Sequence, residues 1–185
     1  MKSTATKMTT KMTYAQYCLL PEDRNRYELI DGELFVTPAP TPKHQEIVGA
    51  LFLRLSAYVQ QSSFGRVYIA PVDVLLDQYT VIQPDVLFIR RERLGIIKEG
   101  AIEAAPDLVV EVLSPSSFYK DLRRKMAAYA QFGVHEYWIV DPETETIELY
   151  QRAGEVLQLA RKFSSNETLQ SPLLEGFQLP VSSIF

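Results

Sequence analysis

The sequence predicts a mixed α/β domain built on one β-sheet, and three observations support this prediction. The chain has 185 residues, a length that suits one domain with a substantial core. Its composition, with 46% hydrophobic and 23% charged residues, is typical of a globular protein. Short apolar runs rich in Val, Ile and Leu alternate with two longer segments of helical periodicity. At least one strand–helix–strand crossover is therefore expected.

The N-terminal segment and the single cysteine bear on the surroundings of the protein. Residues 1–12 are basic and Thr-rich and lack the apolar core of a secretory signal, so we expect a disordered or frayed tail before one domain at residues 13–185. No uninterrupted apolar run is long enough for a transmembrane helix. Cys18 has no partner for an internal disulfide, which favours a reducing cytoplasm, and we expect it to be a small buried side chain near a helix end.

The first part of the domain is expected to contain a short helix and a β-hairpin. Residues 13–20 suit the helix. Strands at residues 27–30 and 33–37 are separated by Asp31-Gly32, and this dipeptide between apolar segments is a strong signal for a tight hairpin turn.

Two longer helices and a series of strands complete the domain. The first helix is expected over residues 43–60, because Thr41 can cap its N-terminus and Pro42 suits the first helical position. The second is expected to start in the Ser-Pro-Ser-Ser run at 114–117 and to end near Phe132. Further strands are expected at residues 66–70 with a continuation through 72–76, and at 81–90, 107–113, 136–140, 147–151 and 157–163, the last two forming a hairpin before a mostly extended C-terminal segment.

Two acidic residues lie inside segments that otherwise resemble strand interiors. Asp85 follows Pro84 in the run VIQPDVLFI, and Glu111 lies in DLVVEVL. Burying a carboxylate is costly unless a metal ion, a cation or a functional cleft compensates it. Proline cannot donate to a β-ladder, so the chain at Asp85 is expected to form an edge or a bulge, features that often re-aim side chains next to active sites.

The second helix directs one lysine toward the sheet. Its apolar residues, spaced to lie on one face, are Phe118, Leu122, Met126 and Tyr129. Lys125 falls at the edge of that face, whereas Arg123 and Arg124 point away. A lysine there can pack its stem and lift its ammonium into water, but the strand before the helix carries Glu111, which favours a functional Lys125. Asp121, one turn earlier, either pairs with Lys125 or is an exposed carboxylate at the edge of the helix.

The first long helix gives a parallel result. Its apolar face is formed by Ile47, Val48, Leu51, Leu55 and Tyr58. His44 lies near the middle of that face at the helix start, where it is either a satisfied core histidine or part of a site, because helix N-termini favour anions. Glu46 points to the opposite side and is expected to face solvent; the alternative is that it reaches the site.

The carboxylates of Asp85 and Glu111, with the backbone carbonyl of Val112, form an all-oxygen set of the kind that Mg²⁺ prefers. A nearby lysine can orient or deprotonate a water or stabilise an oxyanion. This combination suits metal-assisted hydrolysis of a phosphodiester.

These motifs resemble those of a known nuclease family. Pro84-Asp85 followed by Glu111-Val112-Leu113 resembles the PD-(D/E)XK motif of restriction-endonuclease-like nucleases, with Leu113 where a lysine is expected. Together, YELIDGEL, APTPKH, QPD, APDLVVEVLSPS, the D-x-x-x-K-x-x-x-Y helix (Asp121, Lys125, Tyr129) and GVHEYWIVDP are similar to the Uma2 family of proposed endonucleases, from about Met12 to Phe185.

The resemblance implies a restriction-endonuclease-like αβββαβ core with added N- and C-terminal β-hairpins. It also implies a bound Mg²⁺ or Mn²⁺, with Asp85, Glu111 and Val112 as metal ligands and Lys125 as the catalytic lysine moved to the following helix. His44 would assist catalysis. Glu28, otherwise a structural carboxylate of the hairpin, would be accessory, as would Glu46, Asp121 and Tyr129.

Three functions are compatible with these residues. The leading hypothesis is a metal-dependent DNA endonuclease. The second is a catalytically silent module that binds nucleic acid or protein on a nuclease fold, which the net charge of −4 slightly favours. The third is a hydrolase of another phosphate or a glycosidic substrate, against which Lys125 and the oxygen-only ligand set argue.

Cutting both strands of a duplex needs two sites, so a homodimer is expected. The C-terminal GFQLPVSSIF segment could form its interface or fold back onto the core. Two basic clusters, which are either solvated faces or contacts for nucleic acid, consist of Arg90, Arg91, Arg93 and Lys98 and of Lys120, Arg123, Arg124 and Lys125.

Overall fold

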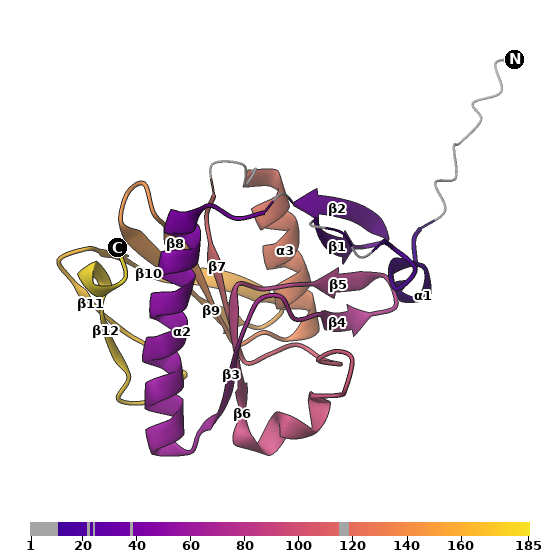
Figure 1. Ribbon diagram of the computed structural model, residues 1–185. Helices are drawn as coiled ribbons and strands as arrows, with labels where there is room; N and C mark the ends of the chain where they lie inside the picture. The colour runs from indigo at the N-terminus through magenta and orange to yellow at the C-terminus, as the bar shows by residue number, and fades with distance from the viewer. Residues whose placement is uncertain (1–10, 22, 24, 38, 115–118) are drawn as a thin grey trace, which may run out of the picture.

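The fold is organised around a twisted six-stranded sheet, shown in a computed structural model that describes residues 11–21, 23, 25–37, 39–114 and 119–185, with the side chains of 119–121 left aside (Figure 1). Across the sheet the strands are β10 (Val156–Ser164), β9 (Thr146–Ala153), β8 (Glu136–Asp141), β7 (Leu108–Val112), β6 (Val86–Arg90) and β3 (Gly65–Ile69). All neighbours are antiparallel except β7 and β8, which are parallel and joined by helix α3 (Tyr119–Phe132). This confirms the expected strand–helix–strand crossover.

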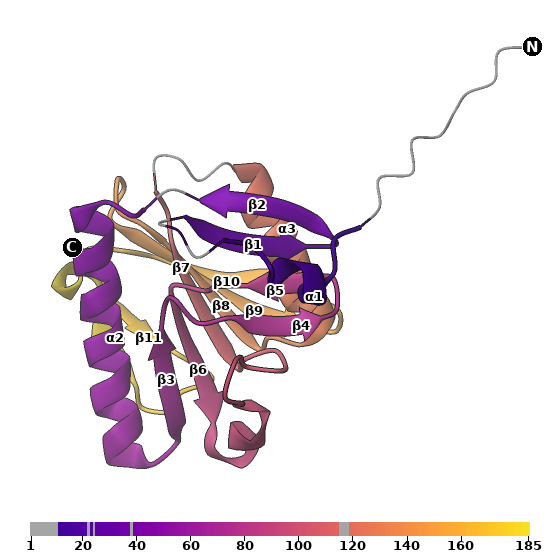
Figure 2. The same ribbon diagram turned by 45° about the vertical axis from the view of Figure 1, so that its right-hand side comes forward.

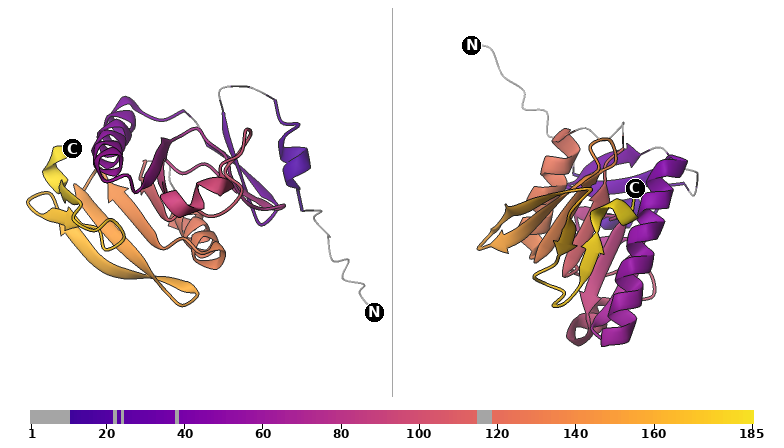
Figure 3. Two further views of the ribbon diagram at one scale, coloured as in Figure 1. Left: turned by 90° about the horizontal axis from the view of Figure 1, so that it is seen from below. Right: turned by 90° about the vertical axis from the view of Figure 1, so that its left-hand side faces the viewer.

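Two helices cover opposite faces of the sheet (Figure 3), and an apolar cluster lies between each helix and the sheet. Helix α2 (Pro42–Ser62) packs through Leu51 and its neighbours against Val110 and Val112 of β7. Helix α3 packs through Tyr129 against the other face, in a cluster that includes Val109. Because side chains alternate along a strand, Glu111 points to the same face as Val109, toward α3.

A smaller four-stranded sheet flanks the main one on the α3 side (Figure 2). Its strands are β2 (Glu33–Thr37), β1 (Arg26–Ile30), β5 (Thr80–Ile82) and β4 (Val74–Asp77). The short helix α1 (Tyr14–Tyr17) packs on it, with Tyr17 contacting Leu29 and Val81. The Asp31-Gly32 turn has positive φ at both residues (51° and 79°), so the expected tight hairpin is confirmed.

Two predicted strands are wrong because each is divided between the two sheets. The run at 81–90 is split into β5 and β6, with the break at Gln83-Pro84-Asp85, where proline cannot continue the ladder. The run at 66–76 is split in the same way into β3 and β4 across the cis Ala70–Pro71 peptide bond. Asp85 therefore lies at a passage between sheets rather than inside a strand.

The helix boundaries follow the sequence signals. Thr41 caps α2 by accepting a hydrogen bond from the His44 backbone N–H, and Pro42 occupies the first turn. Of the run expected to start the second helix, residues 115–117 lie outside the described residues, as do Phe118 of its apolar face and most of the expected N-terminal tail. The loop-like stretch after β6 contains a 3-10 helix, η1 (Arg91–Ile96).

The C-terminal segment folds back onto the core. After the short strands β11 (Thr168–Gln170) and β12 (Gln178–Pro180), it ends in the 3-10 turn η2 (Val181–Ser183), and Phe177, Leu179 and Ile184 are buried in the α2 layer. Of the two expectations for this segment, the intramolecular one is confirmed. Cys18 was expected to be buried and is instead exposed, because α1 ends there and its packing residue is Tyr17.

Gly65 at the start of β3 permits close pairing with β6. A Cβ atom at this position would lie 2.0 Å from the Ile89 carbonyl oxygen. We expect Gly65→Ala to lower the free energy of unfolding by about 1–3 kcal/mol, the usual cost of overpacking. Gly49, inside α2, has no atom within 4 Å of the corresponding position, so Gly49→Ala should stabilise by up to about 1 kcal/mol. Urea denaturation of both variants tests this pair, and equal effects would contradict it.

Candidate active site

Five elements bring charged side chains together where the small sheet meets the main one. Asp85 comes from the passage between β5 and β6, Glu111 from β7, Lys125 from α3 and His44 from the first turn of α2. All four are largely buried, and β1 adds Glu28. Their hydrogen bonds and ion pairs form two groups, one around Asp85 and one around Lys125, which adjoin where Glu111 is followed by Val112 on β7. The two groups together are called the network below.

Asp85, only 3% exposed, is held by donors on both carboxylate oxygens. Arg26 Nη1 donates to Oδ1 at 2.9 Å, and the Val112 backbone N–H donates to Oδ2 at 2.8 Å. His44 Nε2 lies 3.3 Å from Oδ2. Burial on its own raises the pKa of Asp85, but the hydrogen bond from His44 and the charge of Arg26 outweigh it and bring the pKa down to about 2. Asp85 is therefore ionised at neutral pH.

His44 links Asp85 to the end of β7. Its Nε2 lies 3.1 Å from the Val112 carbonyl oxygen, which can only accept, so Nε2 carries the proton. Burial lowers the pKa of His44, but the hydrogen bond and charge of Asp85 outweigh this, so the pKa is raised above its usual value. The apolar face of α2 aims the ring into the site, as the helical periodicity predicts.

Lys125 lies between two carboxylates. Its Nζ donates to Glu28 Oε1 at 2.8 Å and to Glu111 Oε1 at 3.1 Å. The Tyr129 hydroxyl donates to the same oxygen of Glu111 at 2.6 Å. The neighbouring arginines face away from this network, since Arg123 is exposed and Arg124 pairs with a carboxylate on β2.

Lys125 and Glu111 shift each other's pKa values. Burial opposes the charged form of Lys125, but the charges of Glu111 and Glu28 outweigh it, so the pKa of Lys125 lies above its usual value. Burial also raises the pKa of Glu111, and Lys125 only partly opposes that rise. Lys125 is therefore a cation at neutral pH.

Some expected site residues lie elsewhere, and others were missed. Glu46 is exposed on α2, away from the network, and the side chain of Asp121 lies outside the described part of the chain. Arg26 was not predicted, although it stands two residues before Glu28 and therefore on the same face of β1. Gln83 was missed as well, and its backbone N–H donates to Glu28 Oε1 at 2.9 Å.

Comparisons with known proteins agree with this architecture. A crystal structure described as "a putative nuclease belonging to DUF820 from Anabaena variabilis ATCC 29413" superposes with a TM-score of 0.80 at 20% identity, covering 94% of this chain and 97% of that one. A family model described as "Putative restriction endonuclease" matches residues 13–182. The chain belongs to the Uma2 family. No curated protein matches it.

Within this Uma2 chain the restriction-endonuclease-like core can be followed element by element. The order α2, β3, β6, β7, α3, β8 is the expected αβββαβ arrangement. Strands β4 and β5 are inserted between β3 and β6, and they join the β1–β2 hairpin to form the small sheet. The insertion carries the chain into Asp85 and places Glu28 beside Lys125.

The oxygen donors in the network suit a hard divalent cation in kind. They are the carboxylates of Asp85 and Glu111 and the carbonyl of Val112. Asp85 and Val112 are linked by a hydrogen bond and through His44, and Glu111 directly precedes Val112 on β7. No cluster of three His, Cys, Asp or Glu side chains with metal-site geometry is found among the described residues. The set therefore depends on two carboxylates and a backbone oxygen.

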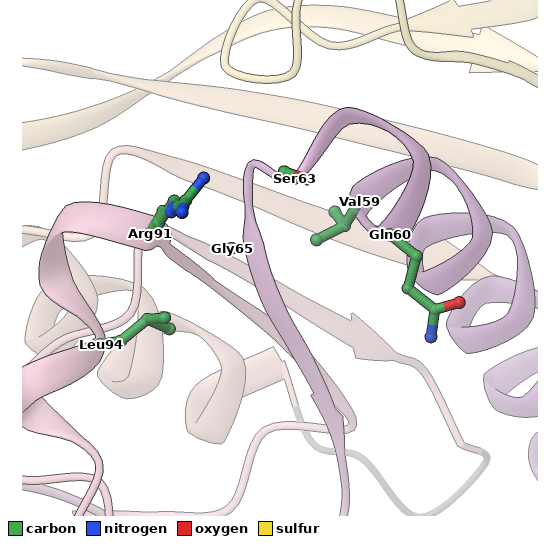
Figure 4. A pocket seen from close by; sticks show the side chains of 6 residues that line it. All are labelled: Val59, Gln60, Ser63, Gly65, Arg91 and Leu94. Atoms are coloured by element: carbon green, nitrogen blue, oxygen red, sulfur yellow. The ribbon is translucent and has the colours of Figure 1, made fainter.

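A separate hollow lies at the opposite end of α2 from His44 (Figure 4). It is lined by Val59, Gln60, Ser63, Gly65, Arg91 and Leu94. None of the network residues lines it.

In the described part of the chain, no helix has the length and apolar character needed to cross a membrane.

Proposed function

We propose that this Uma2 protein is a metal-dependent DNA endonuclease that hydrolyses phosphodiester bonds. The observation that supports this proposal is the convergence of Asp85, Glu111 and Lys125, three largely buried ionised or ionisable groups from separate parts of the fold, in two adjoining groups of contacts. Such a group is costly to assemble for stability alone, because buried charges lose their hydration. Clusters of this kind are typical of functional sites.

Each residue has a role that follows from its contacts. Asp85, Glu111 and the Val112 carbonyl would hold Mg²⁺ or Mn²⁺. When bound, such a cation supplies positive charge next to the phosphate and makes a water molecule more acidic. Lys125, being protonated, stabilises negative charge that develops on the phosphate rather than acting as a base. His44 orients Asp85 and Val112, Tyr129 orients Glu111, and Glu28 holds Lys125.

Supercoiled plasmid DNA provides the direct test. Incubation of the protein with plasmid and MgCl₂ or MnCl₂ should convert the supercoiled form to nicked or linear DNA, and EDTA in excess should stop the conversion. A protein that leaves plasmid, linear duplex and single-stranded DNA intact in both metals would contradict the proposal.

One observation favours a second function, a catalytically silent binding module on the same fold. Asp85 is already neutralised by Arg26 and contacted by His44. A site whose charges are balanced by its own side chains has less need of a metal ion. Calorimetric titration with Mn²⁺ distinguishes the two functions, since the silent module predicts no binding.

A homodimer remains part of the proposal, because cleavage of both strands requires two such sites. The buried C-terminal segment is occupied by its own core, so the interface would lie elsewhere. Light scattering at high protein concentration measures the oligomeric state directly.

A further inference from the structure

Among the described residues, Arg26 makes one side-chain hydrogen bond in the site. Its Nη1 donates to Asp85 Oδ1 at 2.9 Å, while Nε and Nη2 are buried and have no hydrogen-bond partner in the described part of the chain. A guanidinium offers five N–H donors and binds carboxylates best through two parallel bonds. An arginine placed for stability would normally satisfy more of them. The attraction between the charges of Arg26 and Asp85 is therefore the main interaction that holds the guanidinium in place.

Strand β1 carries one positive and one negative side chain, and each of them pairs with a site residue of the opposite charge. Arg26 and Glu28 are two residues apart and share a face of the strand. Arg26 contacts the carboxylate of Asp85, and Glu28 contacts the ammonium group of Lys125 at 2.8 Å. The hairpin therefore supplies an opposite charge to Asp85 and to Lys125, two of the groups to which the proposed function assigns direct roles.

The charges of the described site nearly cancel without any bound ion. Three carboxylates, those of Asp85, Glu111 and Glu28, face two permanent cations, Arg26 and Lys125. His44 adds a third positive charge when it is protonated. A divalent cation next to Asp85 would come close to the Arg26 guanidinium and would be repelled by it, because the pair is largely shielded from water.

We propose that Arg26 is a positioning residue that serves as the resident counter-cation of Asp85 and competes with the divalent cation for that carboxylate. It holds the carboxylate in its orientation when no metal is bound, and it lowers the affinity of the site for metal. This inference rests on the metal site of the proposed function.

The test is the affinity of Arg26 variants for Mn²⁺, measured by calorimetry together with thermal unfolding in EDTA and in MnCl₂. We expect R26Q to unfold at a lower temperature in EDTA, because buried Asp85 loses its partner. Its Kd for Mn²⁺ should fall by about tenfold, within the 10–100-fold range by which residues around a metal site change affinity. If Arg26 were purely structural, its replacement would weaken Mn²⁺ binding and the Kd would rise.

Two further variants make the result specific. Arg124→Gln removes a guanidinium–carboxylate pair with Glu33 that lies on the surface of the same region, and it should leave the Mn²⁺ affinity unchanged. Arg26→Lys keeps the charge but lacks the planar fork, so its Kd should lie between those of wild type and R26Q. Should R26Q not fold, a Kd of R26K above that of wild type, the change expected of a purely structural arginine, would overturn the inference.

The outcomes separate this inference from the proposed function. Equal Mn²⁺ binding by wild type and R26Q overturns the role of Arg26 and leaves the nuclease proposal intact. Binding by R26Q alone supports the role of Arg26 and contradicts metal dependence of the natural protein. Absence of binding in both proteins overturns both proposals.

Discussion

Replacing Asp85 by asparagine is expected to reduce metal-dependent DNA cleavage by at least about 100-fold, the scale of losing one stabilising group at a reacting centre. Both oxygens of Asp85 accept hydrogen bonds, from Arg26 on one side and Val112 on the other. An asparagine has only one accepting oxygen, so its NH₂ group must face a donor. The variant therefore loses both the negative charge and one hydrogen bond.

The same variant is expected to be less stable by about 1–3 kcal/mol, because a buried donor is left unsatisfied. Plasmid cleavage and urea denaturation should be measured on the same preparation, so that loss of activity is not confused with unfolding. Asp77→Asn is the matched control, since Asp77 is exposed and accepts a hydrogen bond from the Tyr79 backbone that asparagine can also accept. Cleavage by folded Asp85→Asn at the wild-type rate would contradict the role of Asp85.

Local patterns in the sequence were enough to direct several side chains correctly. The helical periodicity of α3 turns Lys125 to the sheet, and that of α2 turns His44 inward. Both results follow from 3.6-residue spacing, which depends only on neighbouring residues. Glu111 was also informative from local sequence alone. The apolar composition of the residues around it predicts that this run is buried, so the acid within it stands out.

The partners that come from a different sheet could not be predicted in this way. Arg26 and Gln83 approach the site because β1 and β5 pair in the small sheet, which places the chain before Asp85 next to Glu28. Pairing between strands distant in sequence leaves no periodic signal. The apolar run at 81–90 gave no sign of its division either, except for Pro84, which indicated an edge or a bulge and in fact marks the passage between sheets.

The exposed Cys18 shows a related limit. Cysteine is often buried, but the residue that anchors α1 to the small sheet is Tyr17, through its contacts with Leu29 and Val81 and its hydroxyl bond to the Tyr27 carbonyl. One residue of displacement along a short helix separates a packed side chain from an exposed one. Composition alone does not resolve that difference.

Replacing Lys125 by methionine is expected to abolish cleavage and to destabilise the fold by about 3 kcal/mol or more, the cost of leaving buried charges without their partner. Methionine retains the unbranched apolar stem, so the loss reports on the ammonium group. Without it, the carboxylates of Glu28 and Glu111 face each other with no lysine between them. Plasmid cleavage and thermal unfolding measure the two effects.

The stability deficit of Lys125→Met should depend on pH in a defined direction. Burial already raises the pKa of Glu111 in the folded protein, and removing Lys125 raises that pKa further. A carboxyl whose folded-state pKa is raised binds its proton more tightly when folded, so folding is favoured at low pH and disfavoured as the pH rises through the raised pKa. The deficit should therefore be full at neutral pH, should narrow as the pH falls through that raised pKa, and should be smallest near about pH 4, the ordinary range for a glutamic acid.

Arg123→Met provides the control for this pH profile, because Arg123 is exposed on the same helix. It should unfold at nearly the wild-type temperature at every pH and should retain cleavage. A deficit of Lys125→Met that stays constant from pH 7 down to pH 4 would mean that the lost ammonium acted through packing rather than through the buried carboxylates. The opposite result, a deficit that closes on protonation, assigns its origin to the charges that β1, β7 and α3 bring together.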